Sequence, residues 1–178
     1  SKYTRNRLRS GIGVNLGPNQ GCGLEPVMRL TDDFAGLKAA IGRMKATGNT
    51  NIPMGLMWGW HALSPNAPFD DGQPYGADRL QKIVILMTDG ENVNSTSSNP
   101  DNSTYSGAGL IWQERLGLGV SSSSSQRRAV MDDRLEELCG NLRAREVIVY
   151  TVGVQVDGRT QDLLSGCASQ PANYFNVT

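Results

Sequence analysis

The chain has 178 residues, of which 38% are hydrophobic, so it can close one sizeable core and is too short to argue for two. Seventeen basic residues balance seventeen acidic ones, and no overall charge draws the chain to nucleic acid or to an anionic membrane. The longest apolar run, Ile83 to Met87, is far shorter than the roughly 20 residues that span a bilayer, so we expect a soluble segment.

The two ends of the sequence indicate a piece of a larger protein. The chain begins without Met, its first ten residues lack an apolar signal core, and it stops at Thr178 without a tail. Residues 1–23 are dense in Gly, Asn and Pro, which predicts a loop-rich segment before the domain proper at 24–178. We expect any signal or membrane anchor to lie outside these residues.

Two helices are predicted in the first third of the chain. The first begins at Thr31, a good N-cap followed by two acidic residues, and ends near Gly48 after apolar residues at helical spacing. The second begins near Pro53 and carries an apolar stripe to Leu63, where the letters SPNAP break it.

Three strands and two more helices follow in alternation. The strands are predicted at Lys82–Thr88, Glu146–Gly153 and Tyr174–Val177, and the first two are expected to be covered on both faces, as in parallel sheets. Helices are predicted at Ala129–Leu142 and Thr160–Ser165. This order predicts an α/β fold: a Rossmann-like three-layer sandwich with a mostly parallel sheet flanked by helices.

An insertion rich in Ser, Asn and Gly separates the first two strands. It covers residues from around 92 to 125 and ends in the serine run Ser121–Ser125. Low complexity of this kind favours a flexible linker for the serine run.

Asp89 stands at the carboxyl end of the first strand, where ligands of open parallel sheets bind. Followed by Gly90, its carboxylate can hold a divalent cation; the alternative is that it caps the next element or bonds loop amides. Thr50 lies in a Gly-containing turn before the second helix, and its hydroxyl is an oxygen ligand of the kind that Mg²⁺ accepts. Its alternative role is that of an N-cap.

These segments together resemble the von Willebrand factor type A domain. In that family a metal-ion-dependent adhesion site uses an Asp-x-Ser-x-Ser loop, a Thr in a Gly-rich turn, and an Asp at a strand end. Thr50 in GNT and Asp89 in ILMTDGEN match the second and third parts, and the first is absent from these residues. The resemblance therefore implies a partial site in which Thr50 and Asp89 hold Mg²⁺, Mn²⁺ or Ca²⁺ weakly, or hold no metal.

The resemblance is narrower still for the co-linear motifs PVMRLTDD, GNTNIPMGLMWGWHALSP, IVILMTDGEN, VIVYTVG, LLSGCAS and YFNV. They look like the carboxyl-terminal region of TadG-like proteins of the Tad/Flp pilus-assembly machinery. By that likeness the chain is an incomplete domain, clipped at both ends and without the family's central strand. The position of that central strand is then either filled by another segment, for which SGIGVN is a candidate, or left as an exposed sheet edge that favours self-association.

The three cysteines are too dispersed for a zinc ribbon. From the residues alone, one bridge with a free thiol and three buried thiols stay open. The TadG-like resemblance implies a bridge between Cys139 and Cys167, on the oxidising side of a bacterial cell envelope.

Other chemistry is weakly indicated. His61 stands alone in the second predicted helix, and the acid pairs at 32–33, 70–71 and 132–133 occupy helix starts and a turn, which favours structural roles.

We expect a non-enzymatic protein-binding or adhesion domain of a membrane-anchored pilus-assembly protein, with proteins rather than nucleic acid as partners. The alternatives are a Mg²⁺-dependent α/β hydrolase of phosphate esters, since a strand-end Asp suits that chemistry too, and a structural remnant without a binding site.

Overall fold

The computed structural model describes residues 24–46, 48–96, 103 and 105–178. The chain forms two compact units, one of residues 1–27 with 31–48 and the other of residues 28–30 with 49–178. The predicted loop-rich segment at 1–23, including its candidate replacement strand, lies outside the described residues.

The first unit contains helix α1, Phe34–Arg43. Its N-cap is Asp33, whose Oδ1 accepts a hydrogen bond from the Gly36 amide at 2.9 Å, so the prediction of Thr31 as the cap is wrong. Thr31 closes a smaller turn in which its hydroxyl accepts from the Asp33 amide at 3.1 Å. An aspartate two residues further on competes for the capping position because it meets the amides of the first helical turn directly.

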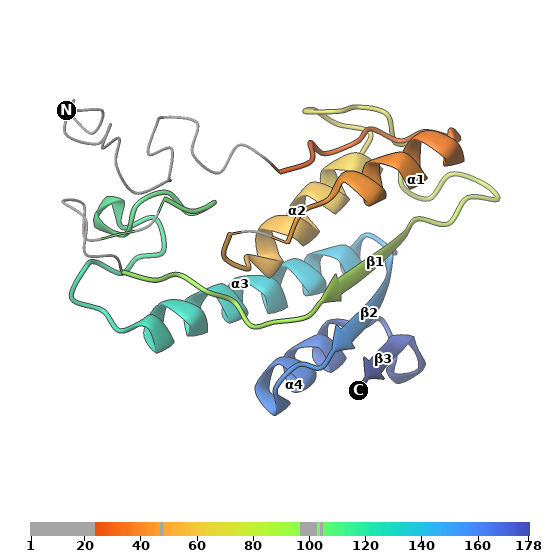
Figure 1. Ribbon diagram of the computed structural model, residues 1–178. Helices are drawn as coiled ribbons and strands as arrows, with labels where there is room; N and C mark the ends of the chain where they lie inside the picture. Colours follow the sequence, from red (N-terminus) through yellow and green to blue (C-terminus); the bar gives the residue numbers. More distant parts are fainter. Residues whose placement is uncertain (1–23, 47, 97–102, 104) are drawn as a thin grey trace, which may run out of the picture. The chain divides into compact units, whose positions relative to one another are not determined.

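The second unit is built on a sheet of three parallel strands in the order β1-β2-β3. The strands are β1 (Ile83–Thr88), β2 (Ile148–Val154) and β3 (Tyr174–Val177), as the apolar runs predict. The register pairs Val84 with Val149 and Val152 with Phe175. The three arrows run in the same direction in Figure 1, so their carboxyl ends share one edge of the sheet.

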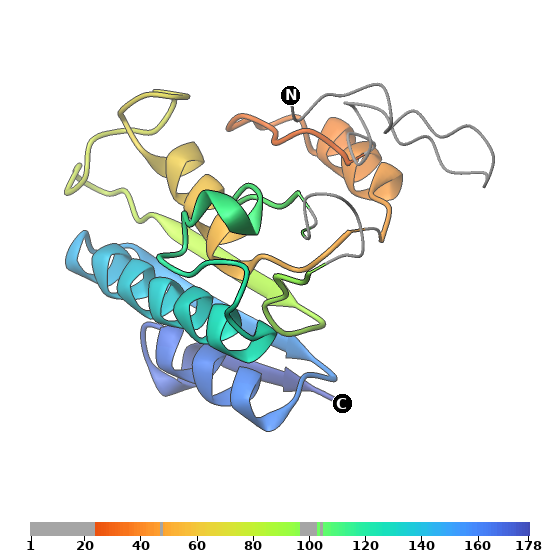
Figure 2. The ribbon, with the colours of Figure 1, turned by 90° about the vertical axis from the view of Figure 1, so that its left-hand side faces the viewer.

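Helices α2 (Ile52–Leu63), α3 (Ser124–Ala144) and α4 (Gly158–Cys167) pack on one face of the sheet. Figure 2 shows α3 and α4 in front of the strands. The shared core is mainly apolar, and the buried Thr151 within it donates its hydroxyl to the Leu164 carbonyl at 2.8 Å. Its fully buried members include Leu56, Leu135, Leu142, Val149 and Leu164.

The other face of the sheet carries exposed apolar side chains. Every second residue of β1 points to it, and Ile85 is 66% exposed whereas its neighbour Leu86 on the helical face is 8% exposed. Phe175 and Val177 of β3 are half exposed on the same face, next to Val152 and Val154 in the register. The second unit is thus an α/β fold with a parallel sheet and helices, a Rossmann-like sandwich in small and incomplete form, which confirms the predicted fold class. The prediction that β1 is covered on both faces is wrong, because the described helices pack on one face only.

The serine run is part of a helix start, so its prediction as a flexible linker is wrong. Ser123 is the N-cap of α3 and forms a capping box with Gln126, in which each side chain bonds the other's backbone amide. Ser124 and Ser125 belong to the first turn of that helix. Serine is a strong N-cap residue, and this role outweighs the low complexity of the run.

Part of the predicted insertion is ordered against α3. The short 3₁₀ helix η2, Ile111–Gln113, lies in it, and Leu110, Ile111 and Leu116 are buried. A second 3₁₀ helix, η3 (Pro171–Asn173), leads into β3. Among the described residues, no helix is both long enough and apolar enough to cross a bilayer.

Candidate functional site

The turn after β1 is held by Thr88 rather than by Asp89. The Thr88 hydroxyl donates to the Gly90 carbonyl at 2.9 Å and accepts from the Gly90 amide at 3.3 Å. Asp89 is exposed, and its carboxylate has no hydrogen bond or ion pair to another described residue. The alternative role for Asp89, bonding loop amides, is therefore filled by its neighbour.

Thr50 is not the N-cap of α2, which was its alternative role. The N-cap of α2 is Asn51, whose Oδ1 accepts from the Met54 amide at 3.1 Å. The Thr50 carbonyl accepts from the Val93 amide at 2.9 Å, which ties this turn to the loop that follows β1. Its hydroxyl lies 3.6 Å from the place that a β-carbon on Gly90 would take. The structure therefore brings Thr50 next to the turn that contains Asp89, although the two residues are 39 positions apart in the printed sequence.

A buried polar network holds the turn of Thr50 against the loop that follows β1. Asn92, which is 2% exposed, accepts a hydrogen bond from the Ile52 amide at 2.8 Å through Oδ1. Its Nδ2 donates to Asp132 Oδ1 at 2.9 Å, and the other carboxylate oxygen of Asp132 accepts from Arg159 Nε at 3.0 Å. The network links α2, the loop after β1, α3 and α4. Sequence analysis did not single out Asn92, and the only signal was its place in the TDGEN motif.

The charges around the site are mostly paired. Glu91 forms an ion pair with Arg128, and Arg159 pairs with Asp132. Asp157 caps α4, and hydrogen bonds from the side chain and then the amide of Thr160 lower the pKa of its carboxyl, with smaller contributions from the charges of Arg128 and Arg159. These acids have structural partners, which distinguishes them from Asp89.

The donor set at the site fits a hard cation with few protein ligands. A carboxylate and a hydroxyl are both oxygen donors of the type that Mg²⁺ and Ca²⁺ take. The described residues contain no group of three or more His, Cys, Asp or Glu side chains arranged for a metal. An ion held by Thr50 and Asp89 would therefore keep water in most of its positions, and the metal role of the pair stays a prediction.

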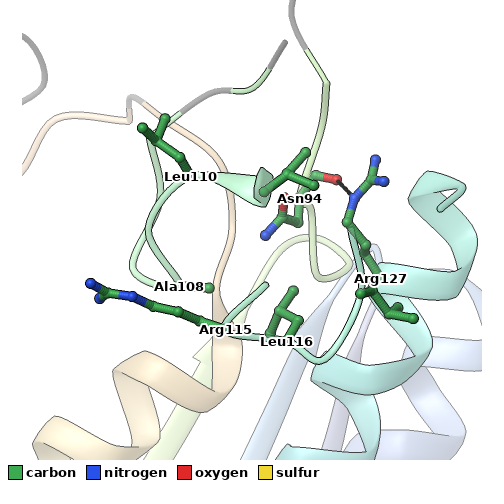
Figure 3. Close-up of a pocket in the computed structure, with 8 residues that line it drawn as sticks. Asn94, Ala108, Leu110, Arg115, Leu116 and Arg127 are labelled. Atoms are coloured by element: carbon green, nitrogen blue, oxygen red, sulfur yellow. Dashed lines mark hydrogen bonds between the residues drawn. The ribbon is translucent and has the colours of Figure 1, made fainter. Parts of the chain in front are cut away.

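A buried arginine anchors the loop between β1 and α3, and sequence analysis missed it. Arg127 is 1% exposed, and its Nε donates to the Asn94 carbonyl at 2.9 Å, as Figure 3 shows. It also donates to Ser122, and burial lowers the pKa of its guanidinium. Asn94 Oδ1 has no hydrogen-bond partner among the described residues, and it adjoins a cavity of about 10 Å³, which is room for one water molecule.

The other sequence candidates have structural roles, as their patterns favour. His61 lies in the last turn of α2 and contacts the ring of Trp58 edge-on, with the ring centroids 5.5 Å apart. Asp71 forms an ion pair with Arg29, whose hydrogen bond lowers the pKa of the Asp71 carboxyl. Of the acid pairs, Asp132 lies close to the Asp89 turn, because it accepts the hydrogen bond from Asn92 described above.

Cys139 of α3 and Cys167 of α4 form a disulfide with their α-carbons 5.2 Å apart, as the resemblance implies. Both are fully buried in the core shared by the helices and the sheet. The bridge joins two helices that are also linked by the Asp132–Arg159 ion pair and by hydrogen bonds from Arg143 Nη1 to the carbonyls of Gly166 and Cys167.

Fold and contacts together define an α/β domain with two oxygen donors at the carboxyl edge of a parallel sheet. No protein-family model matches the chain, and no curated protein matches it either. The likeness to von Willebrand A domains therefore stands on the sequence motifs alone, and the function has to be argued from the geometry.

Proposed function

We propose that this chain is a non-enzymatic protein-binding domain of the von Willebrand A kind, in which Thr50 and Asp89 hold a divalent cation. The observation that carries the proposal is the position of the Thr50 hydroxyl beside Gly90, the residue after Asp89. Local structure uses neither side chain, because Asn51 caps α2 and Thr88 closes the turn. An exposed cation with open positions can accept a carboxylate from a partner protein.

Within the proposal, each residue has a defined task. The Asp89 carboxylate coordinates the ion or orients one of its waters, and the Thr50 hydroxyl supplies a neutral oxygen. Asn92 keeps the two turns together through its hydrogen bond from Ile52. With two protein ligands, the expected dissociation constant is on the order of 10⁻³ M or weaker.

Calorimetric titration with Mg²⁺ and Mn²⁺ tests the cation site. We expect heats of binding that disappear in Thr50→Ala and Asp89→Ala and persist in Asp78→Ala, an exposed acid in the turn before β1. Equal heats in the parent protein and all three variants would show that Thr50 and Asp89 do not bind the cation. A phosphatase screen runs beside it, and robust turnover that is lost in Asp89→Asn would favour a phosphate-ester hydrolase instead.

The disulfide supports a place on the oxidising side of a cell envelope, as in the TadG-like pilus-assembly proteins that the motifs resemble. Structural disulfides persist in such compartments and are rare in the cytosol. For a sequence separation of 28 residues, the chain-entropy relation gives a stabilisation of about 3.5 kcal/mol. Replacing Cys139 and Cys167 together by Ser should lower the free energy of unfolding by about that amount in urea. A reductant should lower the free energy of unfolding of the parent protein and leave that of the double variant unchanged. An equal effect of the reductant on both proteins would contradict a bridged native state.

A further inference from the structure

A groove beside the cation site has the dimensions of a ligand-binding pocket. It lies between α2 and α3, is closed on a third side by residues 107–116, and has a volume of about 420 Å³. Gly107 sits against the start of α2, where a β-carbon would come within 2.9 Å of the Met54 methyl group. The groove is thus formed by a close backbone approach that glycine permits.

The interior of the groove is apolar and rich in methionine. Met54 and Met57 come from α2, and Met131 and Leu138 come from α3. Met131 is buried, whereas Met54, Met57 and Leu138 are only partly covered. Methionine side chains are flexible and polarisable, and they adapt to the side chains of a bound peptide.

The rim of the groove carries an excess of positive charge. Arg115 and Arg134 line it together with Glu137 and Asn141. Arg134 Nη2 donates to the Arg115 carbonyl at 2.6 Å, which holds this guanidinium at the rim. Arg115 extends away from the buried Arg127 (Figure 3). Neither Arg115 nor Arg134 is in an ion pair with a described residue, so both charges are available to an acidic ligand.

The shape of the groove follows its two helical walls. The α3 wall, from Met131 to Asn141, covers about 15 Å at the rise of an α-helix. Met54 and Met57 on α2 and Met131, Arg134 and Leu138 on α3 repeat at helical spacing, so both walls present ridges of side chains. A third helix packs into such ridges with its apolar face down.

We propose that this groove binds an amphipathic helical segment of a partner protein, with large aliphatic residues on its inner face and acidic residues along its flanks. The aliphatic residues contact the methionines, and the acids pair with Arg115 and Arg134. This site goes beyond the proposed cation contact and does not depend on it, because none of its interactions uses a metal.

The test uses two synthetic peptides of 14 residues with leucine at helical spacing, one with glutamate and the other with lysine at all flanking positions. Binding to the whole chain is measured by fluorescence anisotropy in EDTA, so that a failure of the cation proposal leaves the result unchanged. We expect the acidic peptide to bind, and to bind about tenfold more tightly than the basic one, as two rim ion pairs permit. A double variant with Arg115→Glu and Arg134→Glu should reverse this preference, and Arg79→Glu, outside the groove, should not.

Methionine methyl NMR locates the peptide. The chain has six methionines, of which Met54, Met57 and Met131 line the groove. We expect the acidic peptide to shift these three resonances and to leave Met87, on the exposed sheet face, in place. Shifts confined to Met87, equal affinity for both peptides, or no binding of the acidic peptide would each overturn the proposal.

Discussion

Replacing Asn92 by Ala should destabilise the domain far more than a loop asparagine normally does. Asn92 connects the two sides of the buried network, since it accepts a hydrogen bond from the Ile52 amide at 2.8 Å and donates one to Asp132 at 2.9 Å. The variant loses both hydrogen bonds and leaves a buried amide at the start of α2 without an acceptor. At about 1 kcal/mol for each lost bond and 1 kcal/mol or more for the orphaned amide, the expected loss is about 3 kcal/mol.

Urea denaturation at neutral pH measures this loss, which corresponds to a melting temperature about 10 °C lower for a chain of this size. Asn176→Ala is the matched control, because Asn176 is exposed in β3 and should change the free energy of unfolding by less than about 0.5 kcal/mol. A double-mutant cycle of Asn92→Ala with Asp132→Ala should give a coupling energy of about 1 kcal/mol or more.

The same variant should weaken cation binding, because Asn92 holds the start of α2 against the loop that follows Asp89. A loss of stability no larger than that of Asn176→Ala would refute the network as the element that joins these two turns. Unchanged cation heats in a folded Asn92→Ala protein would show that the Thr50 position is set by other contacts.

Two further predictions concern the sheet and the α4 cap. Ile85→Ala should cost less than about 1 kcal/mol and Leu86→Ala about 3 kcal/mol in urea denaturation, because adjacent β1 residues face opposite sides; equal costs would contradict an uncovered sheet face. Asp157→Ala should cost about 1 kcal/mol at pH 7. Hydrogen bonds from Thr160 lower the folded-state pKa of Asp157, so its contribution is complete above the unfolded value of about 3.9 and is lost as the pH falls through the folded value. Unfolding at several pH values should therefore show this cost shrinking below about pH 4, and a cost independent of pH would contradict the assignment.

The strands were predictable because their signal is local and redundant. Lys82–Thr88 and Glu146–Gly153 consist mainly of branched apolar residues. Such a run is sufficient to predict a parallel strand that is buried on at least one face. The caps were less predictable, since several good cap residues stand side by side. Thr31 and Asp33 compete for the start of α1, and only the geometry of the chain entering the helix decides between them.

The contacts that build the candidate site could not be read from spacing. The pairing of Asn92 with Asp132 spans 40 residues, part of it an insertion whose path the sequence does not specify. The same holds for Arg127, whose position in a serine-rich, polar stretch indicates an exposed side chain although it is buried. Long-range hydrogen bonds between single polar residues leave no periodic pattern for sequence analysis to detect.

Thr50 lies beside the turn that contains Asp89, and neither side chain is needed for the local structure, because Asn51 caps α2 and Thr88 closes the turn. Asn51, Ser123 and Asp157 each cap a helix, so replacing any of them has a structural cost that explains its presence. An exposed side chain without a structural task is common and means little by itself. Stability accounts for the buried network, because Asn92 satisfies the Ile52 amide, but it does not account for a Thr50 hydroxyl that is free among the described residues and lies beside the turn that carries the exposed Asp89. The proposed cation site would give these two donors a shared task.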